Sequence, residues 1–264
     1  RPWGGQPQGL PLHWKSLLSH FYFWLGMTAC EKFYLKKMNL AIFDIDGTLT
    51  NTNRVDGLCS LIAFEKTFGI QITNFDWNDY PHVTDMGVAN HIFQEKHSRD
   101  LTTQEVADVT DQLMKEFEKA WKENPEMFLE VPGAGAVFQS MLENENWAVS
   151  IATGCFERSA KFKLNKVEID ITNVPSGFAE DGISREEIVN ASIQRAKEKY
   201  QLAEFEKIVS IGDGLWDLKT AKNLDLHFIG VDVKNRGHLT KVGAGFVLQD
   251  FANQPLFQQY LKDC

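Results

Sequence analysis

The sequence contains five short apolar segments, and each ends in a polar or glycine-rich turn. They are NLAIFDID (39–46), WAVSIATG (147–154), KIVSIGDG (207–214), HFIGVDV (227–233) and GFVLQD (245–250). Continuous apolar runs of this length are typical of strands that are buried on both faces, as in parallel sheets. The segments therefore predict a parallel sheet with helices covering both of its sides.

Helical patterns separate most of these predicted strands. Residues 184–200 begin with Ser184 and Glu187 at capping-box spacing, and apolar positions recur every three or four residues after them. Residues 133–146 and 215–224 are predicted as two further helices. Alternating strands and helices predict an α/β fold, a doubly wound parallel sheet with right-handed crossovers.

One long interval after the first strand lacks any convincing strand pattern. Its predicted helices cover residues 56–69, 85–97 and 102–123, and the last begins with a capping-box pair and carries a clear apolar stripe. We therefore predict an all-helical cap domain over residues 53–129. The α/β core would then consist of residues 38–52 and 130–264.

The N-terminal residues 1–37 differ in composition from the rest of the chain. They are rich in Gly, Pro and Gln, and their apolar run, LLSHFYFWLGMTAC, is shorter than the roughly 20 apolar residues that span a bilayer. A secretory signal segment is the alternative, with Lys15 upstream of the apolar run. We expect an extension outside the fold, which would begin at Met38.

The charge and the cysteines limit the classes of partner. The formal net charge is −9, and no block of basic residues provides the clustered cations that nucleic-acid binding needs. The four cysteines fit neither a zinc site nor a disulfide framework, which favours a reducing compartment. We expect a cytoplasmic monomer or homodimer that binds neither nucleic acid nor membrane.

Acidic residues and a threonine follow three of the predicted strands. Asp44 and Asp46 end the first, Thr153 and Gly154 the second, and Asp213 the third, with Asp217 shortly after it. The carboxyl ends of parallel strands meet at one edge of a sheet, where ligands bind. If Asp44 and Asp46 continue the strand, both carboxylates point the same way, and a divalent cation such as Mg²⁺ would relieve their repulsion.

This set of groups suits transfer of a phosphoryl group. One aspartate would attack phosphorus and form an aspartyl-phosphate, and a second would move protons to the leaving oxygen and from the attacking water. The Thr153 hydroxyl and backbone amides near Gly47 would hold the phosphoryl oxygens, while a cation neutralises their charge.

The motif order DIDGT, a strand ending in Thr-Gly, a basic residue and GDGLWDLKTA resembles the haloacid dehalogenase superfamily over residues 38–264. The resemblance is to the phosphoglycolate phosphatase and β-phosphoglucomutase-like subgroup, whose helical cap follows the first motif. It implies that Asp44 is the nucleophile and Asp46 the general acid/base. Asp213 would bind Mg²⁺ with Asp44 and the Asp46 carbonyl, and Asp217 would support that site.

The resemblance also implies a phosphate-binding set of Gly47, Thr153, Gly154 and a cation. The family usually has a lysine at the start of the helix before GDG, whereas this chain has Arg185 there. Arginine provides the same charge with bidentate geometry. The competing cations are shortly after Thr153, at positions Arg158, Lys161 and Lys163.

The second aspartate narrows the expected reaction. Dehalogenases of the family lack a residue equivalent to Asp46, and its transport ATPases have Lys in place of Ile45. We therefore expect a Mg²⁺-dependent phosphatase that acts on a small phosphorylated metabolite. The alternatives are a phosphomutase, for which Arg54 or Arg99 would bind a second phosphate, and a catalytically silent binding protein. The segment FDWNDYPHVTD (75–85) and Cys155 are weaker candidates for positions near the substrate.

Overall fold

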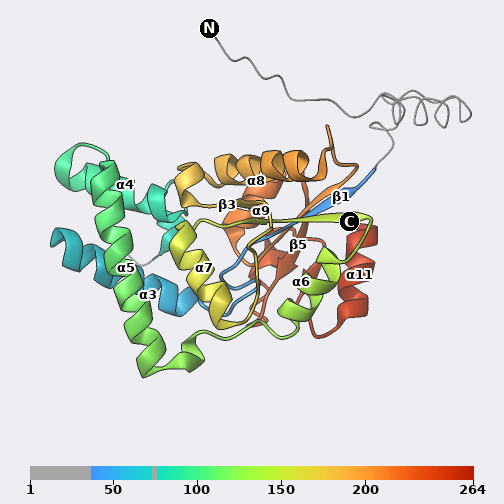
Figure 1. Ribbon diagram of the computed structural model, residues 1–264, viewed down its shortest axis with the longest axis horizontal. Coiled ribbons are helices and arrows are strands. Elements are labelled where there is room, and N and C mark those ends of the chain that lie inside the picture. Colours follow the sequence, from blue (N-terminus) through green and yellow to red (C-terminus); the bar gives the residue numbers. More distant parts are fainter. Residues whose placement is uncertain (1–36, 73–75) are drawn as a thin grey trace, which may run out of the picture. The chain divides into compact units, whose positions relative to one another are not determined.

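The computed structural model of the protein describes residues 37–72 and 76–264, of which Met38–Cys264 form one compact unit (Figure 1). The predicted N-terminal extension lies, apart from Lys37, outside the described residues. A parallel sheet of six strands has the order β3-β2-β1-β4-β5-β6. The strands are β1 Asn39–Phe43, β2 Trp147–Ala152, β3 Ser176–Gly177, β4 Ile208–Gly212, β5 His227–Val231 and β6 Val247–Leu248. The predicted α/β fold with a parallel sheet is confirmed.

Strand β1 occupies an inner position of the sheet, with β2 on one side and β4 on the other. Phe43, the last residue of β1, lies opposite Ile151 of β2 and Ile211 of β4. The three strands therefore end at nearly the same level. The residues that follow them in sequence emerge at one edge of the sheet.

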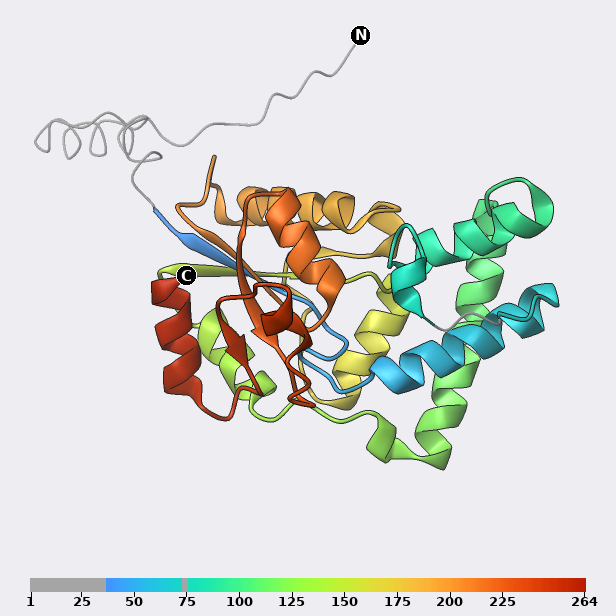
Figure 2. The same cartoon turned by 180° about the vertical axis from the view of Figure 1, so that it is seen from behind.

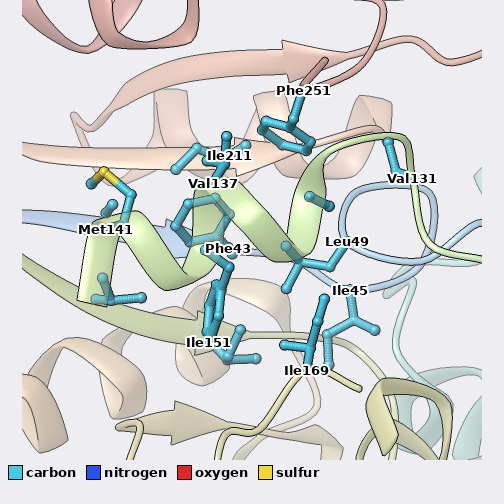
Figure 3. Close-up of a cluster of buried hydrophobic side chains, with 14 of the residues drawn as sticks. Phe43, Ile45, Leu49, Val131, Val137, Met141, Ile151, Ile169, Ile211 and Phe251 are labelled. Carbon is cyan, nitrogen blue, oxygen red and sulfur yellow. The ribbon is translucent and has the colours of Figure 1, made fainter. Parts of the chain in front are cut away.

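The two faces of the sheet are covered by different helices. Strand side chains alternate between the faces, so Ala41 and Phe43 point to one side and Leu40 and Ile42 to the other. The Phe43 side is covered by α6 Ala134–Leu142, α7 Glu157–Lys166 and α11 Gln254–Asp263, and the other side by α8 Arg185–Tyr200 and α9 Leu215–Asn223. In Figure 3, Phe43 lies between Val137 of α6 and Ile151 of the neighbouring strand.

A helical insert follows β1 and lies beside the end of the sheet where the strands terminate (Figures 1 and 2). It contains α3 Asn53–Phe68, α4 Asp85–His97 and α5 Thr103–Glu123. These helices pack around a hydrophobic cluster of their own, which includes Phe64, Phe93 and Phe117. The expected helices are confirmed, and the exact limits of a cap domain stay a prediction.

The chain enters and leaves this insert at one place. The Asn51 N–H donates to the Leu129 carbonyl at 2.7 Å, and the Val131 N–H donates to the Leu49 carbonyl at 3.1 Å. Thr50 and Glu130 form an antiparallel bridge between these two bonds. The two connections are therefore joined like a short piece of sheet.

Some elements differ from the sequence prediction. Residues 245–250 form a strand of only two residues, and β1 ends at Phe43, before the two aspartates. The pattern gives no sign of α7 because its inward face carries Ser159, Ala160, Lys163 and Leu164 in place of an apolar stripe. Short α10 His238–Lys241 and β3 were also not predicted.

Within residues 37–72 and 76–264, no helix combines the length and apolar character that a membrane crossing needs.

Candidate active site

Three carboxylates meet at the edge of the sheet where β1 and β4 end. Asp44 follows β1, Asp213 follows β4, and Asp217 lies in the first turn of α9. Each offers an oxygen, and these oxygens all lie within 4.8 Å of one another. The Asp217 carboxylate accepts a hydrogen bond from the Gly214 N–H at 2.9 Å, which fixes it at the start of the helix. We call Asp44, Asp213 and Asp217 the acidic triangle.

The turn after β1 passes directly over this triangle. Gly47 has a φ of +84°, and a Cβ at this position would lie 2.0 Å from Oδ2 of Asp213. Only glycine fits both the backbone conformation and the space. Asn53 Nδ2 donates to Asp213 Oδ2 at 2.8 Å. The other carboxylate oxygen of Asp213, Oδ1, is buried and has no hydrogen-bond partner among the described residues.

The structure places Arg185 inside the site, at the first position of α8. Its Nη1 lies 3.2 Å from Oδ1 of Asp44 and 3.3 Å from Oδ1 of Asp217. Its Nε donates to the Val83 carbonyl at 3.0 Å, and the side chain is 12% exposed. A Cβ on Gly154 would lie 3.1 Å from the guanidinium, so the glycine lets the backbone approach it closely.

Two of the competing cations lie at the surface. Arg158 pairs with Asp111, and Lys161 pairs with Glu157 at 2.6 Å, and all four side chains are about half exposed. The structure therefore separates these two cations from the acidic triangle.

The third competing cation, Lys163, forms a second buried cluster beside the first. Its side chain is fully buried, with Nζ 2.6 Å from Oδ2 of Asp46 and 2.5 Å from Oδ1 of Asp56. Cys155 Sγ lies 3.1 Å from both Asp46 Oδ2 and Lys163 Nζ, and Thr52 donates to Asp46 Oδ1 at 2.5 Å. Strand β1 ends before Asp44 and Asp46, so strand alternation does not set their directions. The two carboxylates take separate partners, and both line one cavity.

A cavity of about 340 Å³ lies over both clusters and extends into the helical insert. Asp44, Asp46, Thr153 and Arg185 line its polar end. Trp77, Val83, Thr84 and Asp85 of the 75–85 segment also line it, whereas Tyr80 and His82 are not among the lining residues. The cavity is large enough for a small ligand, since binding pockets typically have volumes from about 300 Å³ upward.

The family model described as haloacid dehalogenase-like hydrolase matches residues 38–225 of the chain. This span contains β1 to β4, the helical insert and both clusters. The chain belongs to this family. No curated protein sequence matches the chain.

Solved structures share the fold of this hydrolase at low sequence identity. A hydrolase from Pseudomonas syringae is 18% identical, with a TM-score of 0.63, and the match covers 85% of this chain and 98% of that chain. A provisionally assigned β-phosphoglucomutase from Bacteroides vulgatus is 16% identical, with a TM-score of 0.60 and coverage of 94% and 98%. A phosphoglycolate phosphatase, assigned by prediction, from Haemophilus somnus is 15% identical, with a TM-score of 0.54 and coverage of 85% and 100%.

The two clusters of the hydrolase differ in their electrostatics. Burial, together with the nearby Asp217 carboxylate, raises the pKa of Asp44 to about 7, and burial and Asp44 raise the pKa of Asp213 well above its ordinary range. Burial also opposes ionisation of Asp46, but the Lys163 ammonium outweighs it and lowers the pKa of Asp46. In the described part of the chain, the three carboxylates of the acidic triangle therefore share one cation, Arg185, whereas Asp46 is paired with Lys163.

Sequence reasoning missed Asp56, and it included Asp85 only as the last residue of the 75–85 segment, without a role of its own. Asp56 lies in the first turn of α3 and Asp85 at the start of α4, where ordinary helix N-terminal acids are common. Nothing in their spacing separates them from such surface acids. The Asp85 Oδ2 accepts the Phe156 N–H at 2.9 Å, which joins the insert to the loop after β2.

Replacing Asp85 with asparagine should flatten the pH dependence of stability. Burial and the Asp56 carboxylate raise the pKa of Asp85 to about 8, whereas it titrates near 4 in an unfolded chain. The folded protein binds the proton of the Asp85 carboxyl more tightly than the unfolded chain does. The free energy of unfolding therefore falls as the pH rises from about 4 to about 8, by up to about 1.4 kcal/mol per pH unit. Asp85→Asn removes this loss and keeps an oxygen for the Phe156 N–H.

Urea unfolding of wild type and Asp85→Asn at several values between pH 5 and 8 measures this effect. We expect the free energy of unfolding of the variant, relative to that of the wild type, to increase steadily as the pH rises. Parallel profiles for the two proteins would show that Asp85 does not hold its proton in the folded state.

Proposed function

We propose that this hydrolase is a Mg²⁺-dependent phosphatase that cleaves small phosphate monoesters through an aspartyl-phosphate. The observation that carries the proposal is the position of Asp44. Its carboxylate lies at the polar end of the cavity, within the acidic triangle and 3.2 Å from the Arg185 guanidinium. A nucleophile, a metal-binding set and a phosphate-binding cation thus share one small volume.

The acidic triangle fits a magnesium ion. Mg²⁺ prefers carboxylate oxygens, and Asp213 Oδ1 is a buried oxygen without a hydrogen-bond partner among the described residues. A cation would also offset the repulsion that raises the pKa of Asp44. Asp44, Asp213 and the Asp46 carbonyl would hold the ion, with Asp217 in support. When bound, Mg²⁺ neutralises charge on the phosphoryl oxygens.

The first chemical step uses both aspartates of the DIDGT motif. An Asp44 carboxylate oxygen attacks phosphorus while the bond from phosphorus to the ester oxygen breaks. Asp46 in its protonated form gives its proton to that oxygen, which leaves as an alcohol. Arg185 and the hydroxyl of Thr153, a buried residue that lines the cavity, would hold the phosphoryl oxygens.

The second step regenerates the carboxylate of Asp44. Water attacks the phosphorus of the aspartyl-phosphate, the bond to the Asp44 oxygen breaks, and Asp46 takes the proton from the water. Lys163 favours the ionised form of Asp46 that this step needs. The Thr52 hydroxyl holds the other oxygen of Asp46, so its direction is set by the protein.

Removing the metal should abolish phosphate release. We expect turnover of an aryl phosphate to fall to background in excess EDTA and to return when Mg²⁺ is added in excess, measured as inorganic phosphate. Mg²⁺ should also raise the melting temperature of the wild type, because binding to the folded state stabilises it. Asp213→Asn should lose most of this increase, whereas Asp108→Asn, an exposed change on α5, should keep it. Undiminished turnover in EDTA would contradict the proposal.

A phosphomutase is the second candidate, and one observation favours it. Arg54, at the start of α3, lines the cavity, and in a phosphomutase it would bind the second phosphate. Arg99, the other candidate from the sequence, pairs with Glu105 at 2.7 Å and is not among the cavity residues. Incubation with a sugar 1-phosphate separates the functions, because a mutase yields the 6-phosphate isomer and a phosphatase yields free phosphate.

A further inference from the structure

The lining of the cavity is polar near the acidic triangle and becomes apolar inside the helical insert. Inside the insert its walls come from three helices, with Phe64 from α3, Ala89 from α4, and Val109 and Leu113 from α5. All four belong to the hydrophobic cluster of the insert, and none is more than 6% exposed. The cavity thus penetrates the core of the insert, and we call this part the apolar chamber.

Most polar groups around the chamber already form hydrogen bonds or ion pairs with other residues of the protein. The Thr84 hydroxyl donates to the Ile183 carbonyl at 2.7 Å, and Asp85 accepts the Phe156 N–H. The Asp56 carboxylate pairs with Lys163. Ser60 Oγ is buried, lines the cavity and has no hydrogen-bond partner among the described residues. The chamber wall therefore offers a ligand the Ser60 hydroxyl and a wide apolar surface, and the cations that also line the cavity, besides Arg185, are Arg54, Lys234 and Arg236.

We propose that the substrate is the phosphate monoester of a compact apolar alcohol, a proposal that rests on the phosphatase function above. The phosphate would lie at Asp44 and Arg185, and the hydrocarbon body would fill the apolar chamber. Burial of apolar surface in such a cavity is favourable, and dry apolar cavities bind hydrocarbon ligands. The Ser60 hydroxyl can form a hydrogen bond with one polar group on that hydrocarbon body.

The same walls disfavour a sugar phosphate. A hexose carries several hydroxyls, and each one that is buried without a hydrogen-bond partner loses its bonds to water without replacement. Ser60 can bond to one of them, and Arg54, which lines the same cavity, can bond to another, so most of the hydroxyls would still lack a partner. The chamber therefore discriminates by the polarity of the leaving alcohol rather than by its size.

Two primary phosphate esters of similar size test this preference. Cyclohexylmethyl phosphate and glucose 6-phosphate both place a six-membered ring one carbon from the ester oxygen, so their leaving groups are closely matched. With Mg²⁺, we expect kcat/KM for the cyclohexylmethyl ester to exceed that for the glucose ester by about tenfold or more. Methyl phosphate, which has no body to fill the chamber, provides the reference ester.

A matched pair of variants localises the preference. Ala89→Leu adds three carbons to the chamber wall, and Ala107→Leu makes the same change on the exposed face of α5. We expect Ala89→Leu to lower the ratio of kcat/KM for the cyclohexylmethyl ester to that for methyl phosphate by about tenfold or more. Ala107→Leu should keep the wild-type ratio.

The outcomes separate this proposal from the function on which it rests. A wild-type preference for the cyclohexylmethyl ester that Ala89→Leu reduces supports the apolar chamber. Equal or better turnover of glucose 6-phosphate overturns the substrate class and leaves the phosphatase function intact. Absence of phosphate from every ester, methyl phosphate included, overturns both.

Discussion

Replacement of Asp44 by asparagine will abolish phosphate release, with a loss of kcat on the order of 10⁴-fold or more, as is typical when a catalytic nucleophile is removed. The amide of asparagine cannot provide the anionic oxygen that attacks phosphorus. It has nearly the same shape, and it removes one negative charge from the acidic triangle. The folded structure should therefore survive, and a melting temperature at or above that of the wild type will show that the loss is chemical.

The assay for this variant needs both a control and a second readout. Asp108→Asn makes the same chemical change on the exposed face of α5, at a residue that does not line the cavity, and should keep wild-type turnover. Brief incubation of the wild type with substrate, followed by acid quench and intact-mass measurement, should detect the aspartyl-phosphate that Asp44→Asn cannot form. Wild-type turnover by Asp44→Asn would assign the nucleophile to another residue.

Replacement of Lys163 by methionine will cause the largest loss of stability. The ammonium of Lys163 is fully buried between two carboxylates, at 2.6 Å from Asp46 and 2.5 Å from Asp56. Methionine fills similar space but leaves both acids without their partner. Breaking a buried ion pair by removal of one member typically costs about 3–5 kcal/mol of folding free energy. Urea unfolding at pH 7 measures the loss.

Two further variants show whether the unpaired charge is the cause. Lys161→Met removes an exposed lysine two positions away, whose surface pair with Glu157 contributes at most about 1 kcal/mol. Adding Asp56→Asn to Lys163→Met should recover part of the lost stability, because it removes one of the two stranded charges. A double variant as unstable as Lys163→Met alone would point to packing against Phe117, whose ring centroid lies 5.7 Å from Nζ, as the cause.

The residues at the ends of the strands could be predicted because the pattern around them is strong. Apolar runs before Asp44, Thr153 and Asp213 indicate buried parallel strands, and parallel strands present their carboxyl ends at one edge. The register confirms this geometry, since Phe43 lies opposite both Ile151 and Ile211. The sequence order alone therefore predicts which side chains meet there.

The second cluster could not be predicted as a unit: Asp46, Lys163 and Cys155 are candidates one by one, but nothing in the sequence joins them to one another or to Asp56. Lys163 lies in a helix whose inward face is partly polar, and Asp56 is separated from it by more than one hundred residues of sequence. A charged residue in a polar helix normally faces water, and only the packing of α7 under the insert buries this one. The apolar chamber is likewise a property of three helices together, since its walls come from residues of α3, α4 and α5 that are far apart in the sequence.

The paired connections at Thr50 and Glu130 have a consequence for how such a protein can change. The chain leaves the α/β core and returns to it at the same place, because residues 49–51 pair with residues 129–131. Removal or replacement of the helical insert would therefore leave the order of the strands unchanged. We expect that an insert with a differently lined chamber could be exchanged here, giving a new choice of alcohol to an unchanged set of reactive groups.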